Sequence, residues 1–170
     1  MQTIDKAPKV FAVSGIKNSG KTTLIEKLVT ALNSKGYKVG VIKHDGHEFE
    51  ADREGTDSFR HKKAGAKNVI VYSKTKIMMV KDEESPSIEE LIKLQQDMDL
   101  IIIEGMKYSK FPKIEIVRAA ISSQSVCDKQ TLLALVTDTD LEISGVKKVS
   151  LNDIETLLGI IQDYILCLET

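Results

Sequence analysis

The sequence predicts an α/β fold in which helices flank a mostly parallel, twisted sheet, in three layers. Segments with strand character alternate along the chain with segments of helical periodicity, and such alternation produces right-handed βαβ units with parallel strands. Short apolar segments also stand where buried strands are expected, and one of them lacks any polar alternation, which is typical of a central strand covered on both faces. These segments are Val10–Ser14, Leu100–Glu104, which is the central one, and Leu132–Thr137.

The first part of the chain predicts a strand, a glycine-containing loop, a helix and a second strand. Leucines recur at helical spacing over residues 22–36, and a glycine stands where this helix should stop. Residues 38–43 form the next expected strand. Residues 44–57 are polar and show no period, so we expect a long loop, and loops of this length are usually functional or mobile.

The middle of the chain predicts shorter elements. A short helix over residues 58–64 is followed by two strands, at 68–72 and 76–80. Ser87 and Glu90 have the spacing of a capping box, which opens a helix that reaches about residue 96.

The C-terminal part predicts the last strands and a final helix. Residues 113–118 alternate between polar and apolar, which favours a more exposed or edge strand. Residues 150–153 cap a helix that runs to about Cys167. Because ligands of parallel sheets bind at the carboxyl ends of the strands, the loops after residues 14, 43, 104 and 137 should share one rim.

Length and charge narrow the classes of function. The 170 residues predict one nucleotide-binding domain over 1–170. Lys and Arg number 24 and Asp and Glu 25, which argues against nucleic acid and against a polybasic membrane anchor as partners. The beginning of the chain has no apolar signal segment, and its two cysteines form no CxxC pair, so we expect a cytoplasmic protein.

Residues 15–22, GIKNSGKT, match the phosphate-loop pattern GxxxxGK[ST], between an expected strand and an expected helix. The glycines let the backbone wrap an anion, and the helix N-terminus adds positive charge. Lys21 would reach the β- and γ-phosphates, and the Thr22 hydroxyl would bind Mg²⁺. Lys17 is a further electrostatic helper. The phosphate-binding candidates are Gly15, Lys17, Asn18, Ser19, Gly20, Lys21, Thr22 and Thr23.

Glu104 ends the central apolar strand and should face the phosphate loop from a neighbouring strand. It is expected to hold the Mg²⁺ shell or to orient a water, although Asp is the usual residue there. The alternative is a solvated carboxylate at a strand end. Asp45, after the second strand, is placed to approach Mg²⁺ through water, and His44 and His47 form a weak signal for a transition metal.

Two further sets of residues each allow a functional and a purely structural interpretation. Asp52, Arg53, Asp57 and Ser58 form either a switch-like segment that senses the γ-phosphate or a solvated polar loop. Asp138 and Asp140 follow the last buried strand, where a carboxylate can accept hydrogen bonds from guanine, but acidic turn residues explain them equally well.

Three blocks of the chain resemble the MobB family of adapter proteins in molybdopterin-guanine dinucleotide biosynthesis. They are GIKNSGKTTLIEKLV, VGVIKHDGHEFEADREGTDSFRHKKAGA and DLIIIEGMKYSKFPKIEIVR. The resemblance covers about residues 9–140, and the middle block is more specific than the phosphate loop.

The resemblance implies a P-loop NTPase fold of the class that dimerises around its nucleotide sites. It also implies binding of GTP and Mg²⁺ with slow hydrolysis, and a helper role beside the transferase that joins GMP to molybdopterin. Lys107, Lys110 and Lys113 are candidates to meet a pterin phosphate. By this resemblance the rim is lined by His44, Asp45, Asp57, Ser58, Arg60, Glu104 and Lys107.

Three rival functions remain open from the sequence. A small-molecule kinase is disfavoured because the chain has only three arginines to clamp two phosphorylated substrates. A metallochaperone GTPase would need a cluster of Cys and His residues at its dimer interface. It is disfavoured because the two cysteines of this chain are isolated. A binding module that never hydrolyses nucleotide would keep the phosphate loop and lack a well-placed water activator.

Overall fold

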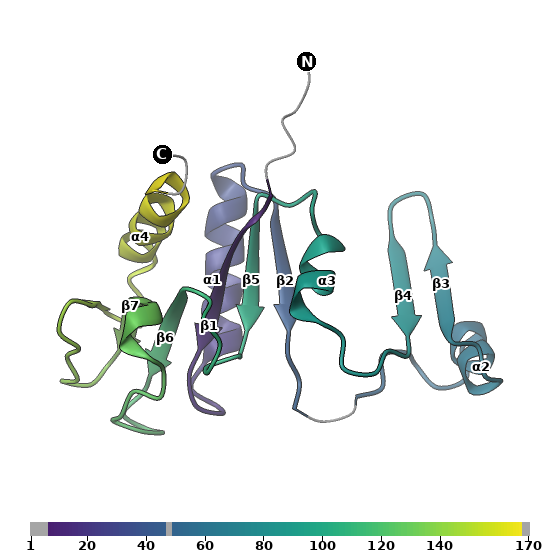
Figure 1. The fold of residues 1–170 in the computed structure, drawn as a ribbon, viewed down its shortest axis with the longest axis horizontal. Helices are drawn as coiled ribbons and strands as arrows, with labels where there is room; N and C mark the ends of the chain where they lie inside the picture. The colour runs from purple at the N-terminus through teal and green to yellow at the C-terminus, as the bar shows by residue number, and fades with distance from the viewer. Residues whose placement is uncertain (1–6, 47–48, 168–170) are drawn as a thin grey trace, which may run out of the picture. The chain divides into compact units, whose positions relative to one another are not determined.

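The computed structural model describes residues 7–46 and 49–167. The chain divides into two compact units, one formed by Met1–His44 and Leu91–Thr170 and the other by Asp45–Glu90. The helices α1–α4 and the strands β1–β7 are labelled in Figure 1.

The first unit is built on a six-stranded sheet with the order β2-β5-β1-β6-β7-β8, and all its paired strands run parallel. The predicted parallel sheet flanked by helices is therefore confirmed. Strand β8 was not predicted, because it has three residues, two of them lysines, and no apolar run. The strands are β1 Lys9–Ser14, β2 Val39–Lys43, β5 Leu100–Glu104, β6 Lys113–Val117, β7 Leu132–Thr137 and β8 Lys147–Val149.

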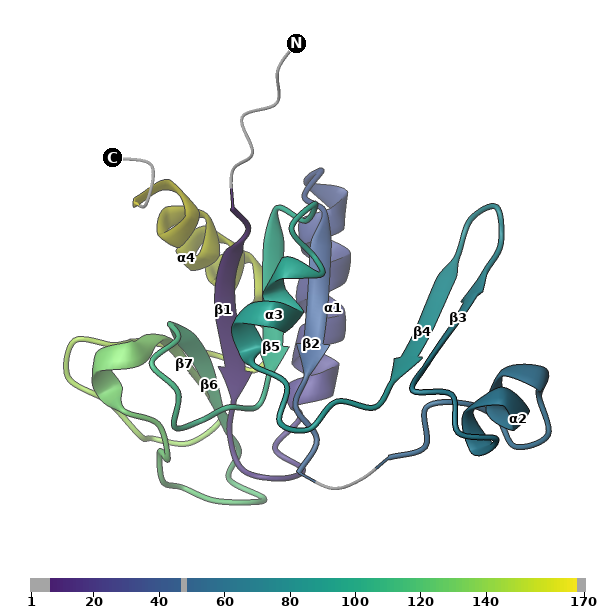
Figure 2. The same ribbon diagram turned by 45° about the vertical axis from the view of Figure 1, so that its right-hand side comes forward.

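Helices α1 (Lys21–Ser34) and α4 (Ile154–Cys167) contact each other on one face of this sheet. The segment that follows α3 (Ile88–Lys93) packs against β2 on the other side of the sheet from α1 (Figure 2). A Cβ on Gly40 of β2 would lie 1.9 Å from Oε1 of Gln95, so glycine allows this close approach.

The core lies between the sheet and the two helices α1 and α4, and alternate residues of each strand point into it. If this alternation continues to the strand ends, Glu104 of β5 and Arg118, directly after β6, point to the side on which α1 lies. The central core residues are Phe11, Val13, Leu28, Leu32, Leu100, Ile102, Ile114, Ile116, Val136 and Leu158.

The prediction of an exposed or edge strand at residues 113–118 is wrong. Strand β6 lies between β1 and β7, and all five of its residues are buried. Its polar residues are paired beneath neighbouring loops. Lys113 Nζ donates a hydrogen bond to the Ser109 carbonyl at 2.5 Å, and the Glu115 carboxylate accepts from the Val126 amide at 2.7 Å. The alternation of polar and apolar residues in β6 therefore reflects two faces of the strand that are both covered, one apolar and one polar.

The helix starts follow the local sequence. Ser87 Oγ accepts a hydrogen bond from the Glu90 amide at 3.2 Å, while Glu90 Oε2 accepts from the Ser87 amide, so the predicted capping box is present. Helix α3 is three residues shorter than predicted, ending at Lys93 instead of residue 96. At α4 the cap is Asp153, whose carboxylate accepts from the Thr156 amide at 3.1 Å.

The second unit contains helix α2 (Asp57–Lys63) and an antiparallel hairpin of β3 (Asn68–Tyr72) and β4 (Ile77–Lys81). These elements lie within one residue of their predicted bounds. Residues Ile70, Tyr72, Ile77 and Met79, which form register pairs on one face of the hairpin, are all exposed. The hairpin therefore carries an apolar face that its own unit leaves uncovered.

Candidate functional site

The phosphate loop connects the end of β1 to the start of α1. Three of its residues, Gly15, Asn18 and Gly20, have positive φ values of 147°, 65° and 97°. A Cβ on Gly15 would lie 2.5 Å from the Ile116 carbonyl oxygen, so only glycine fits beside β6. The Ser19 amide donates to the Ile16 carbonyl at 3.2 Å and closes the turn.

Helix α1 begins in a way that suits an anion. Gly20 stands at its N-cap without a capping side chain, and its first turn contains no acidic residue. The first amides of a helix lack partners within the helix, and the helix dipole adds partial positive charge there. The amides that follow Gly20, including those of Thr22 and Thr23, are thus placed to receive a phosphate.

Lys21 bends back over this loop. Its Nζ donates a hydrogen bond to the Ile16 carbonyl at 2.9 Å. Burial lowers the pKa of Lys21, the negative charge of Glu104 opposes that shift, and the positive charges of Lys107 and Lys43 add to it. The Lys21 ammonium group is therefore held beside the loop, near one negative charge, Glu104, and two positive charges, Lys107 and Lys43.

Thr22 and Glu104 meet across two elements. The Thr22 hydroxyl donates a hydrogen bond to Glu104 Oε1 at 3.0 Å. Glu104 stands in register with Val13 of β1 on one side and with Lys43 of β2 on the other. A hydroxyl and a carboxylate are oxygen donors of the kind that Mg²⁺ prefers, so these two residues fit the Mg²⁺ that a phosphate loop implies.

The predicted rim forms from the carboxyl ends of β1, β2 and β5. The His44 amide donates to the Glu104 carbonyl at 3.2 Å, and Ser14 Oγ donates to the Gly105 carbonyl at 2.6 Å. Lys107 follows on the same side, with its Nζ 4.9 Å from the centre of the Tyr108 ring.

One lysine expected at this rim lies elsewhere. Lys113 is fully buried, and its Nζ is held by the carbonyl of Ser109. Burial also lowers the pKa of Lys113. The expectation that Lys113 meets a pterin phosphate is therefore wrong, because strand β6 turns this side chain beneath a loop. Lys110 is exposed.

Asp138, directly after β7, is exposed at the same sheet edge. Its Oδ1 accepts a hydrogen bond from the Ala119 amide at 2.7 Å. This contact joins the loop after β7 to the loop after β6. One carboxylate oxygen of Asp138 thus has a structural partner within the protein.

The remaining predicted residues belong to the second unit. Asp57 and Arg60 form an exposed ion pair at 3.6 Å, and the Ser58 hydroxyl lies 3.3 Å from that of Thr56. The nearby Ser58 hydroxyl is the main cause that lowers the pKa of Asp52. Asp45 is also in this unit, whereas His47 lies outside the described residues.

Arg118, which is not among the predicted site residues, also lies beside the loop. Atoms Cδ and Nη1 of Arg118 lie 3.7 and 3.8 Å from the position that a Cβ on Gly20 would take. A signal existed, because Arg118 continues the alternation of Ile114 and Ile116 to the carboxyl end of a strand that neighbours β1.

Within residues 7–46 and 49–167, no group of three or more His, Cys, Asp or Glu side chains is arranged to hold a metal ion. Over the same residues, no helix is both long enough and apolar enough to span a membrane.

A family model, several relatives and several solved structures point to the same family. The family model described as "Molybdopterin guanine dinucleotide synthesis protein B" (MobB) matches residues 10–138. The molybdopterin-guanine dinucleotide biosynthesis adapter proteins of Haemophilus influenzae and Escherichia coli are both 31% identical to the chain. The alignments cover 92% and 91% of this chain and 89% and 92% of those proteins. The crystal structure of Bacillus subtilis MobB superimposes with a TM-score of 0.73 at 26% identity, covering 89% of this chain and 97% of that one.

Proposed function

This chain belongs to the MobB family, and on that premise we propose that it is a GTP-binding adapter in molybdenum cofactor biosynthesis. In this role it assists the transferase that attaches GMP to molybdopterin. It acts in the cytoplasm, and residues 1–170 work as one nucleotide-binding protein. Its own GTP hydrolysis is slow and depends on Mg²⁺.

The observation that carries nucleotide binding is the complete phosphate loop with the Thr22–Glu104 contact beside it. The loop amides and the Lys21 ammonium would hold the β- and γ-phosphates. When bound, Mg²⁺ neutralises phosphate charge, and Thr22 and Glu104 would hold it, with Asp45 approaching through water. Glu104 also remains the candidate that orients the attacking water.

The guanine preference would come from Asp138. Its second carboxylate oxygen can accept from the N1 and N2 donors of guanine, which adenine does not offer. The contact between Asp138 Oδ1 and the Ala119 amide supports this role, because it fixes the direction of the carboxylate.

A homodimer is the proposed working form. The exposed apolar face formed by Ile70, Tyr72, Ile77 and Met79 supports it, because an apolar face of this kind is typical of an interaction surface.

The rim residues His44 and Lys107 are further candidates for nucleotide or pterin contact, with Asp57, Ser58 and Arg60 from the second unit.

The test is a calorimetric titration with GTP and with ATP, first with Mg²⁺ and then with EDTA, on the wild type and on Lys21→Ala. We expect GTP to bind at least about tenfold more tightly than ATP, a difference of about 1.4 kcal/mol. Lys21→Ala should lose binding and keep the wild-type circular dichroism spectrum. Tighter binding of ATP would contradict the proposal and favour a kinase, and unchanged affinity in Lys21→Ala would refute the site. Tight stoichiometric binding of nickel or zinc would favour a metallochaperone.

A further inference from the structure

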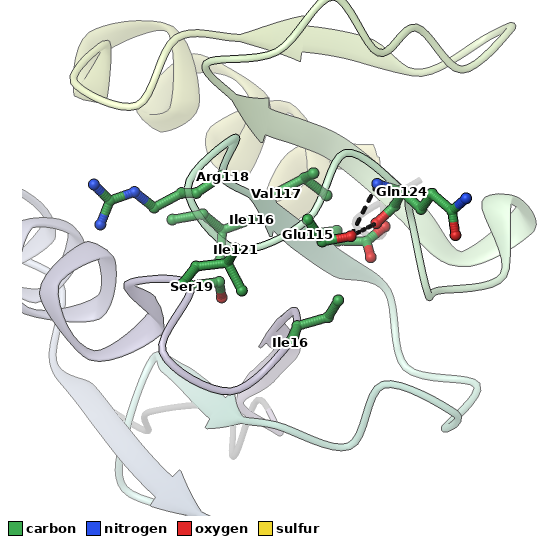
Figure 3. A pocket seen from close by; sticks show the side chains of 9 residues that line it. Ile16, Ser19, Glu115, Ile116, Val117, Arg118, Ile121 and Gln124 are labelled. Atoms are coloured by element: carbon green, nitrogen blue, oxygen red, sulfur yellow. Dashed lines mark hydrogen bonds between the residues drawn. The ribbon is translucent and has the colours of Figure 1, made fainter.

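The two flanks of the phosphate loop carry different side chains. Strand β1, which leads into the loop, lies between β5 and β6. On the β5 flank stand Glu104 and the cations that influence Lys21. The β6 flank carries two charged residues, the buried Glu115, which Ser125 and the Val126 amide hold, and Arg118, which has no role so far. Figure 3 shows Arg118 extending from the end of β6 toward the start of α1.

The Arg118 side chain lies within reach of whatever the loop binds. Its Nη1 is 3.8 Å from the position of a Cβ on Gly20, the residue that heads α1. The amides that follow Gly20 are the proposed phosphate donors. A phosphate held by them would therefore come close to the guanidinium, which is suited to bidentate contact with phosphate oxygens.

Two polar atoms on this flank are buried without a hydrogen-bond partner among the described residues. They are Nε of Arg118 and the hydroxyl oxygen of Ser19, a residue that is only 1% exposed. Both residues line the same small cavity between the phosphate loop and the segment after β6. A buried donor without an acceptor is unfavourable. The cavity has no room for a water molecule, so an anionic ligand would contact the guanidinium from the Gly20 side, where Nη1 lies.

The position of β6 in the sheet indicates which part of a nucleotide would lie here. Strand β6 separates β1 from β7, and Asp138, the candidate base contact, follows β7. The Ala119 amide, next to Arg118, donates to Asp138. A nucleotide that runs from the phosphate loop to Asp138 must therefore pass Arg118 between its phosphate and nucleoside ends.

We propose that Arg118 is a nucleotide-binding residue whose guanidinium contacts the nucleoside end of the phosphate chain, the α-phosphate. This assignment rests on the proposed function and adds a second cation to that site, on the flank opposite Glu104. Because GTP and GDP share the α-phosphate, Arg118 contributes equally to the binding of both.

The experiment is calorimetry with GTP and GDP on the wild type, Arg118→Gln, Arg118→Lys and the control Lys129→Gln. Lys129 is an exposed cation in the short helix before β7. We expect Arg118→Gln to weaken GTP and GDP by the same factor, about tenfold or more. Arg118→Lys should recover part of the loss, and Lys129→Gln should bind as the wild type does.

The outcomes separate this assignment from the proposed function. If the wild type binds both nucleotides and Arg118→Gln binds them equally well, only the role of Arg118 is overturned. Weakening of GTP alone would also overturn it, because the contact would then be to the γ-phosphate. If the wild type binds neither nucleotide, the proposed function fails and this assignment fails with it. Thermal melts without nucleotide show whether each variant is folded. If Arg118→Gln does not fold, Arg118→Lys tests the assignment in its place.

Discussion

The hydroxyl of Thr22 lies 3.0 Å from Oε1 of Glu104, although 82 residues separate them in the chain. Parallel pairing of β1 with β5 brings the two together, since it places the carboxyl end of β5 beside the loop that follows β1. This contact joins the start of α1 to the carboxyl end of β5.

Glu104→Gln should reduce Mg²⁺-dependent GTP hydrolysis by about a hundredfold if the carboxylate activates water. Glutamine keeps an acceptor for the Thr22 hydroxyl but loses the negative charge. Single-turnover release of phosphate measures the effect. Asp99→Asn is the matched control, because Asp99 stands just before the opposite end of β5 and accepts a hydrogen bond from the Lys38 amide. Equal turnover in Glu104→Gln and wild type would show that Glu104 does not activate the water.

Asp138→Asn should weaken GTP by roughly tenfold or more and leave ATP unchanged. Asparagine can still accept from the Ala119 amide through its side-chain oxygen, so the loop should stay in place. Only the second carboxylate oxygen, the proposed acceptor for guanine, becomes a donor. Competition titrations measure both affinities, with Glu142→Gln, at an exposed carboxylate further along the same loop, as the control. Parallel losses for GTP and ATP would mean that Asp138 does not read the base.

Tyr72→Asp and Ile77→Asp should convert a dimer into a monomer. These side chains are 80% and 78% exposed on the hairpin, and a carboxylate placed there would be buried without a partner in an apolar interface. Light scattering after size exclusion should give twice the 18.9 kDa chain mass for the wild type and once that mass for the variants. Thr75→Asp, in the hairpin turn, is the control. A monomeric wild type, or variants that remain dimeric, would exclude the hairpin face as the interface.

Cys127 should react slowly with thiol reagents at pH 8, whereas the exposed Cys167 should react quickly. Burial and the nearby charge of Glu115 raise the pKa of Cys127 from 9.0 to about 12, so little thiolate is present at pH 8. Absorbance assays on Cys167→Ser should show a labelling rate that climbs with pH toward 12. Fast labelling of that variant at pH 8 would contradict the raised pKa of Cys127.

The raised pKa of Cys127 also predicts that the free energy of unfolding falls at alkaline pH. The folded state favours the neutral thiol of Cys127, so its contribution to the free energy of unfolding is complete below pH 9.0 and is lost as pH rises to about 12. Urea unfolding of wild type and Cys127→Ala between pH 8 and 11 measures it. The stability difference between the two should shrink toward high pH, and a constant difference would be evidence against the shift.

Local patterns predicted most of the elements. The phosphate loop, the buried strands and the capping box of Ser87 and Glu90 depend on residues a few positions apart, so they can be recognised without a fold. Strand β8 was missed because three residues with two lysines carry no such pattern. Strand β6 was misplaced because its polar residues, Lys113 and Glu115, find partners in distant loops.

The sequence by itself determined the fold class, the phosphate loop and the family resemblance, because each depends on short-range spacing of residues. Only the tertiary structure placed Glu104 against Thr22, turned Lys113 inward and brought Arg118 beside Gly20. The physical reason is strand order. The pairing of β1 with β5 and β6 decides which side chains flank the loop, and that pairing joins segments roughly 90 to 100 residues apart through contacts that no local pattern encodes.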